Sequence, residues 1–230
     1  MGHGGTEIGG HKVAVLAGLA FNMDTLYMTW LTMLCVTLGM LFVRVNWQLV
    51  PGSWQNFVEL VVEGLLEQID STIGPKGRKV AALILTLFPF LLISNWLGLI
   101  PGFTSPTNDI NTTLGLALLM VLLAHGYSIK NKGLFTHLKH FVKPNILFLP
   151  INIIEELAKP VTLSFRLFGN ILAGEILIII LGILVPYVVP TLWLAFSVFV
   201  GIIQALIFTM LSMSYLSNSF QEHHEVEKEG

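Results

Sequence analysis

Residues 159–175 read KPVTLSFRLFGNILAGE and open an apolar run that continues to Val185. Arg166 stands inside this run, among phenylalanine, leucine and glycine residues. A cation in the centre of a membrane-spanning helix costs about 2.5–3.5 kcal/mol on insertion scales. The guanidinium group cannot avoid this cost by losing its proton, because its pKa stays above about 12. The stretch therefore predicts a long membrane helix in which one permanent charge has a function.

The composition also indicates a membrane protein. The chain has 230 residues, of which 54% are hydrophobic and only 11% are charged, whereas soluble domains carry about 25% charged residues. The formal net charge of −2 argues against a nucleic-acid partner. Cys35 is the only cysteine, which excludes an intrachain disulfide and a cysteine-based metal site. Motifs of hydrolases, metalloproteases and phosphate-binding enzymes are missing, so we expect neither catalysis nor a cofactor.

Apolar runs of about 20 residues mark the membrane-crossing helices. They predict an all-α integral membrane protein with about five crossing helices, an amphipathic surface helix and two long tilted helices near the C-terminus. The surface helix is indicated by Glu59, Glu63 and Glu67, which recur on one helical face. Within a single membrane domain (1–230), the expected elements are an outer N-terminal segment (1–25), a span (26–45), the surface helix (54–73), two spans (80–100 and 112–129), a re-entrant segment and long helix with Arg166 (145–185), a long C-terminal helix (191–216) and a cytoplasmic tail (217–230).

The distribution of cations predicts the orientation in the membrane. The loop of residues 101–111 has no lysine or arginine. The connections on the other side, with the adjoining helix ends, carry eight of the twelve cations: Arg44, Lys76, Arg78, Lys79, Lys130, Lys132, Lys139 and Lys143. Positively charged loops stay in the cytoplasm, so we expect the N-terminus outside and the C-terminus in the cytoplasm. A bacterial plasma membrane is the expected location, with the thylakoid membrane as the second choice.

Arg166 and Glu175 are predicted to lie on different surfaces of one helix. Nine residues at about 100° each place them about 180° apart and about 13 Å along the axis. They cannot form an ion pair within the helix, whereas a pair that served stability would be spaced i,i+4. The Arg166 face also carries Thr162, Asn170 and small residues, which let another helix approach closely.

Polar residues of the other spans form two groups, one towards each end of the helices. The outer group could line a wet pocket around Glu175 and consists of Ser94, Asn95, Asn111, Thr112, Thr113, Ser197, Gly201 and Gln204. The inner group consists of Glu155, Glu156, Lys159 and Thr162. Asn95, Ser197 and Gln204 are explained equally well as interhelical hydrogen bonds, worth about 0.6 kcal/mol on average. Neither group crosses the membrane, so we expect two access paths with Arg166 between them.

The histidines are not expected to bind metal. His125, near the inner end of the third span, is interpreted as structural. His137 and His140 lie in a basic loop that offers no further ligands. The Glu222-His223-His224-Glu225 cluster lies on a polar terminal tail and is interpreted as a solvated end.

Several short motifs occur in a fixed order along the chain. The most specific is Lys159-Pro160, Arg166-Leu167-Phe168-Gly169-Asn170 and Gly174-Glu175. Others are Ser94-Asn95 before Gly98-Leu99-Ile100-Pro101, Pro106-Thr107-x-Asp109-x-Asn111, Gln204-Ala205-x-Ile207-Phe208 and Tyr215-Leu216. Together these motifs resemble subunit a of the F-type ATP synthase membrane sector. The resemblance covers nearly the whole chain.

This resemblance implies an ion-translocating stator subunit, with the proton as the expected ion. It implies that Arg166 faces the carboxylates of a rotating ring of proteolipid subunits, the c-ring. The two long C-terminal helices would pack against that ring. The other implied partners are the b-subunit peripheral stalk, the lipid bilayer and the remaining ATP synthase complex.

The same resemblance implies a division of the polar residues into two half-channels. Asn95, Glu175 and Gln204 belong to the outer one. Ser197 stands where some relatives carry a histidine, so water held by Ser197 is expected there in place of a histidine relay. Glu155 and Glu156 are the candidates for the inner one.

A self-contained ion channel or secondary transporter is the alternative function. It would conduct ions as a purified chain without partners. The absence of a continuous polar stripe argues against it, and no internal repeat of the transporter type is found.

Overall fold

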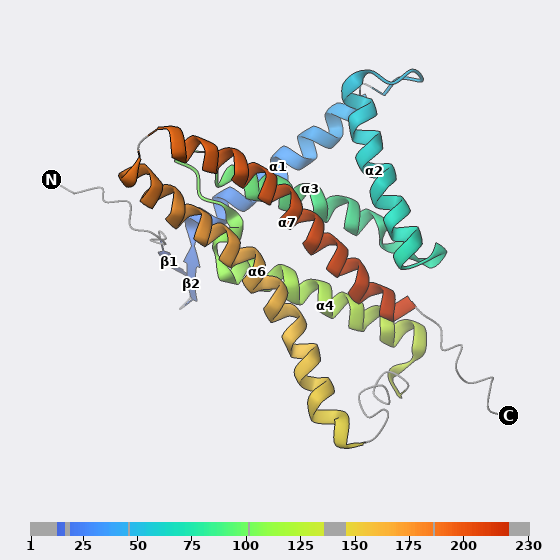
Figure 1. Cartoon of the computed structure of the whole chain (residues 1–230). Helices are drawn as coiled ribbons and strands as arrows, with labels where there is room; N and C mark the ends of the chain where they lie inside the picture. Colours follow the sequence, from blue (N-terminus) through green and yellow to red (C-terminus); the bar gives the residue numbers. More distant parts are fainter. Residues whose placement is uncertain are drawn as a thin grey trace. The chain divides into compact units, whose positions relative to one another are not determined.

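A computed structural model describes residues 13–16, 19–45, 47–100, 102–135, 146–185 and 187–220 of the chain. In these ranges six α-helices dominate (Figure 1): α1 (Met23–Val45), α2 (Ser53–Thr72), α3 (Ala81–Leu97), α4 (Ile110–Lys132), α6 (Leu149–Leu184) and α7 (Val188–Phe220). Three short 3-10 helices are η1 (Pro75–Val80), η2 (Pro106–Asn108) and η3 (Ile146–Phe148). The helical architecture confirms the predicted fold class.

Within the described ranges, five helices are long and apolar enough to cross a membrane. They are Met23–Val45, Pro75–Leu97, Ile110–Lys132, Leu149–Leu184 and Val188–Phe220. The sixth, α2, buries Leu65 and Ile69 and exposes Glu63 and Glu67. This alternation gives α2 one apolar and one acidic face, as in helices that lie along a surface.

A short antiparallel hairpin precedes the first long helix. Strand β1 (Val13–Leu16) pairs with β2 (Leu19–Asn22), and Val13 lies opposite Asn22. The sequence predicts an outer segment here but no strands. Four-residue strands give too short an alternating pattern to be distinguished from a general apolar run.

The sequence predicts a re-entrant segment and a long helix with Arg166 over residues 145–185. Residues 149–184 form one helix of 36 residues, and Pro160 lies inside it. Proline removes one helix hydrogen bond, yet proline is tolerated within membrane helices because neighbouring groups satisfy the freed carbonyl. Leu163 and Leu167 beyond the proline are buried, at 1% and 0% exposure. Their packing favours a helix that continues through Pro160.

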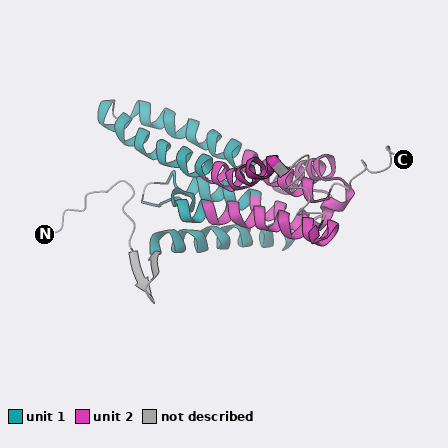
Figure 2. Cartoon of the chain, turned by 90° about the horizontal axis from the view of Figure 1, so that it is seen from below, with its two compact units in different colours: residues 1–46, 88–113, 165–206 teal, residues 47–87, 114–164, 207–230 magenta. Residues whose placement is uncertain are grey.

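The chain divides into two compact units (Figure 2). Unit 1 consists of residues 1–46, 88–113 and 165–206. Unit 2 consists of residues 47–87, 114–164 and 207–230. Helices α3, α4, α6 and α7 contribute residues to both units, so the polar residues of one helix belong to two separate sites.

In unit 2 the end of α7 is fixed by hydrogen bonds to two other helices. Ser217 Oγ donates to the Thr72 carbonyl at the end of α2, at 2.6 Å. Ser219 Oγ donates to the Ala124 carbonyl of α4, also at 2.6 Å. The Lys132 ammonium at the end of α4 donates to the Asn218 carbonyl at 2.6 Å. A cation near the last carbonyls of a helix also favours its dipole.

Candidate functional site

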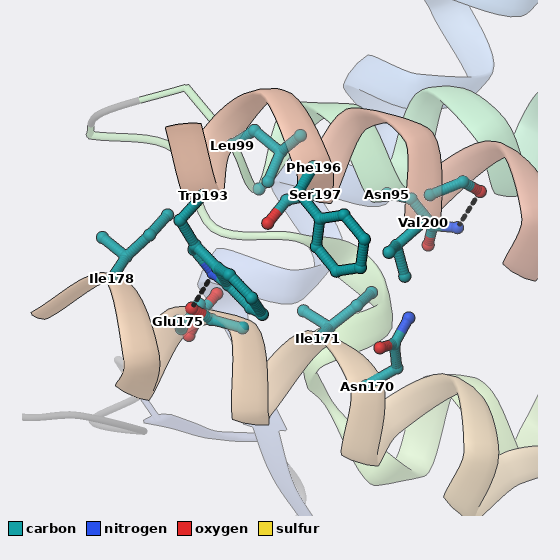
Figure 3. Close-up of a pocket in the computed structure, with 13 residues that line it drawn as sticks. Asn95, Leu99, Asn170, Ile171, Glu175, Ile178, Trp193, Phe196, Ser197 and Val200 are labelled. Atoms are coloured by element: carbon teal, nitrogen blue, oxygen red, sulfur yellow. Dashed lines mark hydrogen bonds between the residues drawn. The ribbon is translucent and has the colours of Figure 1, made fainter. Parts of the chain in front are cut away.

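A cavity of about 80 Å³ lies in unit 1 (Figure 3). A buried water needs about 10–15 Å³ of such volume, so the cavity has room for several waters. It is lined by Asn95, Gly98, Leu99, Asn170, Ile171, Gly174, Glu175, Ile178, Trp193, Phe196, Ser197, Val200 and Gly201. Four residues predicted for ion translocation, Asn95, Asn170, Glu175 and Ser197, thus share one cavity.

The helical repeat explains why these residues meet. The lining residues of α6 fall at 170, 171, 174, 175 and 178, and those of α7 at 193, 196, 197, 200 and 201. Both sets follow the three- and four-residue spacing of one helical face. Trp193 Nε1 donates to the Gly174 carbonyl at 3.3 Å and joins the two helices. In Figure 3, Asn170 lies at one end of the α6 side of the cavity and Glu175 lies towards the other end, where Ile178 is labelled.

Asn108 contacts Glu175 directly and was not predicted from the sequence. Its Nδ2 donates to Glu175 Oε2 at 2.7 Å. Asn108 is 6% exposed and stands at the end of η2. The sequence motif around Pro106 singles out the residues on both sides of Asn108, but helical periodicity says nothing about where a loop residue points.

Asp109 ties the loop before α4 to the N-terminal part of the chain. Its Oδ2 accepts from Asn22 Nδ2 at 2.5 Å and from Thr25 Oγ1 at 3.1 Å. Its Oδ1 accepts from the backbone and side-chain nitrogens of Asn111, at 2.9 and 3.0 Å. Burial raises the pKa of Asp109, but these hydrogen bonds to the charged form outweigh burial and leave the pKa below its ordinary value. Asn111 therefore serves Asp109 and is not a cavity residue.

Replacing Asp109 by asparagine is expected to lower the free energy of unfolding by about 1–3 kcal/mol, because a charged acceptor of several donors is lost. The lowered pKa means that this contribution is present above about pH 3.9, the ordinary value, and is lost as the pH falls further. In the variant, the free energy of unfolding should therefore depend less on pH in the acid range. Thermal unfolding of the purified protein in detergent measures both effects.

The matched control is Asp70→Asn. Asp70 pairs with Arg78 at 3.1 Å, and their side chains are 40% and 73% exposed. Exposed pairs contribute about 0–1 kcal/mol. An equal loss of stability in the two variants would contradict the role given to Asp109.

Asn95 both lines the cavity and makes interhelical hydrogen bonds, the two roles that the sequence left open. Its Nδ2 donates to the Gly201 carbonyl at 3.1 Å, and its Oδ1 accepts from Thr107 Oγ1 at 3.2 Å. It also lines the cavity. The end of α3 lies close to the following loop, because a Cβ on Gly98 would lie 2.6 Å from Ser105 Cβ. Glycine at position 98 thus permits the close contact with Ser105 that holds the end of α3, and with it Asn95, at the cavity.

Gln204 lies one turn beyond the cavity on α7. It is 5% exposed and does not belong to the lining residues. Its Nε2 has no hydrogen-bond partner within the described ranges. A buried donor without a partner costs about 1–3 kcal/mol, so a water molecule is expected beside it.

Arg166 is exposed and does not line the cavity. Within the part of the chain that the structure describes, it has no hydrogen bond and no ion pair. Asn170, one turn later, is half-buried and reaches the cavity. The charge of Arg166 thus lies outside the cavity. Asn170, the nearest polar cavity residue on α6, is four residues further on, which is about 6 Å along the helix axis.

Unit 2 contains a separate polar cluster around Glu156. Lys159 Nζ donates to Glu156 Oε1 at 2.5 Å, and His125 Nε2 lies 3.4 Å from Glu156 Oε2. Lys159 also lies 5.9 Å from the centre of the Tyr215 ring, within the range of a cation–π contact. Residues of α4 and α6 thus converge on one carboxylate, and α7 contributes the ring beside Lys159. The pairing of His125 was not predicted, because it joins two helices that are distant in the sequence.

The other two residues of the predicted inner group are exposed. Glu155 and Thr162 both lie on the uncovered surface of α6. The described ranges contain no group of three or more histidine, cysteine or acidic residues placed to bind a metal ion. His137, His140 and the cluster at 222–225 lie outside the described residues.

Comparison with known proteins assigns this arrangement to a family. The family model of the ATP synthase A chain matches residues 26–217. The chain belongs to the ATP synthase A chain family. ATP synthase subunit a of Desulforamulus reducens is 42% identical over 212 residues, which cover 88% of this chain and 81% of the relative. That of Geobacter sulfurreducens is 38% identical over 205 residues, covering 87% and 89%.

A third relative, ATP synthase subunit a 1 of Syntrophotalea carbinolica, is 41% identical over 199 residues and covers 85% of both chains. Membership of the ATP synthase A chain family makes the chain an ion-translocating stator subunit of the membrane sector. It is a non-catalytic, multi-pass membrane subunit of the ATP synthase complex, and these relatives are bacterial. The predicted family and the prediction that the chain is not an enzyme are confirmed.

Proposed function

We propose that the chain carries protons through two offset half-channels that are separated by Arg166, and that it exchanges them with the carboxylates of a rotating c-ring. One observation carries the proposal. Glu175 lies at a cavity large enough for water, whereas Arg166 on the same helix is exposed, outside that cavity and without a partner in the described residues. A charge placed in this way is suited to an external carboxylate.

The cavity supplies the outer half-channel. Glu175 is its ionisable member, and Asn95, Asn170 and Ser197 offer hydrogen bonds to water. Gln204 extends the polar path by one turn along α7, since its amide is buried without a partner in the described residues. A proton can thus move from water to Glu175 and along the cavity to Asn170, in the helical turn that follows Arg166.

Arg166 then acts by electrostatics. Opposite charges 4 Å apart attract by about 4 kcal/mol at an effective dielectric constant of 20. The fixed cation therefore favours the ionised form of a ring carboxylate that arrives beside it, and so favours release of its proton. The same charge repels a free proton that would pass straight between the half-channels. With the short route closed, the gradient turns the ring.

During this rotation, a ring carboxylate that was protonated at the outer half-channel is neutral and can enter the lipid. It returns after nearly a full rotation to the inner half-channel. We place this exit at the polar residues of α6 in unit 2. Glu156 is held by Lys159 and His125, while Glu155 and Thr162 remain open to solvent or a partner.

The proposed orientation has the N-terminus outside and the C-terminus in the cytoplasm of a bacterium. Support comes from unit 2, where the end of α7 contacts the ends of α2 and α4. The basic residues Arg78 and Lys79 follow α2, and Lys130 and Lys132 close α4. Positively charged ends favour the cytoplasm. The c-ring, the b-subunit stalk and the surrounding lipid are the proposed partners.

Thiol accessibility tests the outer path. In a Cys35→Ser background, Ser197→Cys places a single thiol in the cavity. A hydrophilic methanethiosulfonate reagent added from the outside is expected to react with it and lower proton flux through the complex about tenfold, because a bulky group displaces the waters. Proton flux into vesicles measures the effect.

Phe199→Cys is the control in the same background. Phe199 is exposed on α7, at 57%, and does not line the cavity. It should be modified slowly, with little loss of flux. Failure of the reagent to reach the Ser197→Cys thiol from the outside, with the complex assembled, would refute the outer half-channel.

A further inference from the structure

The contact between Asn108 and Glu175 has an unusual feature. Asn108 donates from Nδ2 to the carboxylate at 2.7 Å, but its other polar atom, Oδ1, is buried and has no hydrogen-bond partner in the described residues. Buried polar atoms are hydrogen-bonded in the large majority of cases. An acceptor left open beside a proton-carrying group therefore needs an explanation.

The backbone of Asn108 is held by hydrogen bonds, whereas its side-chain amide is held at one atom only. The Asn108 amide nitrogen donates to the Ser105 carbonyl at 3.0 Å. The next residue, Asp109, is held by Asn22, Thr25 and Asn111. In contrast, the side-chain amide has only the bond to Glu175 among the described residues, so it can turn about its last torsion without breaking any other hydrogen bond there.

An asparagine amide presents donors on one side and an acceptor on the other. An ionised carboxylate accepts only, whereas a protonated carboxyl also donates. With Nδ2 towards Glu175, Asn108 satisfies the ionised form, as observed. Turned by about 180°, the same side chain would present Oδ1 to the proton of the neutral form.

We propose that Asn108 is a positioning residue that holds Glu175 in both protonation states by turning its amide. This inference rests on the proposed function, in which Glu175 carries protons. Asn108 does not line the cavity, so it leaves the water side of the carboxylate open. An excess proton carried as hydronium by the cavity water joins Glu175 and leaves neutral water behind. The amide then turns, and it turns back when the proton returns to the cavity water, so Asn108 keeps the side chain in place throughout.

The surroundings of Glu175 make the test clear. The described residues that line its cavity include no lysine, arginine, histidine or second acid. The nearby acid of the loop, Asp109, is engaged with Asn22, Thr25 and Asn111. Removing the hydrogen bond from Asn108 to Glu175 is therefore expected to change the pH dependence of proton uptake from the cavity.

The experiment measures proton flux through the assembled complex in vesicles as a function of the outside pH. Asn108→Leu keeps the size of the side chain but removes the hydrogen bond to Glu175 and the acceptor that the turned amide would offer. Bonds to a charged acceptor are stronger than neutral ones, so the ionised form of Glu175 loses more. We expect the pH midpoint of flux to rise by about one unit and the maximal flux to fall at least about threefold.

Asn108→Asp provides a second test if the leucine variant fails to assemble. Two carboxyl groups at hydrogen-bond distance share a proton, so the midpoint should rise further. Asn111→Leu is the matched control, since it removes an amide of the same loop whose partner is Asp109. Its pH midpoint should equal that of the unmodified chain.

An unchanged midpoint in Asn108→Leu or Asn108→Asp would overturn the proposal. An equal shift in Asn111→Leu would do the same, because it would trace the effect to the loop. Glu175→Gln distinguishes a failure of this inference from a failure of the proposed proton transfer by Glu175. If that variant conducts normally, the proton role of Glu175 fails; if it blocks flux while Asn108→Leu keeps its midpoint, only the role of Asn108 fails.

Discussion

Replacing Arg166 by alanine is expected to lower ATP synthesis driven by a proton gradient at least about 100-fold, the usual scale for losing a preorganised charge. Without the cation, the ionised form of an arriving carboxylate is no longer favoured. The barrier to direct proton passage is also removed, so the membrane should leak. Synthesis and proton leak are measured in vesicles that contain the complete complex.

The structure indicates that this variant should still fold and assemble. Arg166 is exposed, and it has no hydrogen bond or ion pair with the described part of the chain. Surface substitutions of this kind change stability by about 0.5 kcal/mol or less. Loss of synthesis would then report the function of the charge and not a loss of structure.

Two further variants define the role of Arg166. Arg166→Lys keeps the charge but loses the planar group that can hold a carboxylate through two bonds, so an intermediate rate is expected. Arg78→Ala is the matched control, because Arg78 is an exposed arginine paired with Asp70. Coupled synthesis in Arg166→Ala, or an equal loss in Arg78→Ala, would contradict the proposed mechanism.

The second large effect is expected from Glu175→Gln. Glutamine has the same shape, lines the same cavity and can still accept from Asn108. It cannot carry a proton. Because a positioned acid or base contributes about 10²–10⁴-fold to proton transfer, proton flux should fall at least about 100-fold while the amount of assembled complex stays unchanged.

Glu63→Gln is the control for Glu175. Glu63 is an exposed acid on α2 and does not line the cavity of Glu175. Its variant should conduct like the unmodified complex. Normal flux through Glu175→Gln would remove Glu175 from the path, and with it the assignment of the cavity as the outer half-channel.

The long helices could be predicted because their apolar runs match the thickness of a membrane. The continuity of the helix through Pro160 could not, because proline ends most helices in water but is accommodated among packed apolar residues. Buried Leu163 and Leu167 show this packing in the structure. The paired strands at residues 13–16 and 19–22 were missed because they have only four residues each.

Helical spacing also explains which parts of the site could be foreseen. Glu175 and Ser197 follow the helical repeat of α6 and α7, and they line one cavity. Asn108 could not be predicted, because its approach to Glu175 depends on the path of the loop before α4. The same limit applies to His125 and Glu156, whose contact depends on the packing of α4 against α6.

The central claim is that Arg166 closes the direct route between the half-channels, and proton leak through a complex with an immobilised c-ring tests it most directly. With the ring cross-linked to the stator, rotation cannot carry protons. The unmodified complex should then be impermeable, whereas Arg166→Ala should conduct protons down the gradient. An Arg166→Ala complex that stays as tight as the unmodified one would contradict the claim.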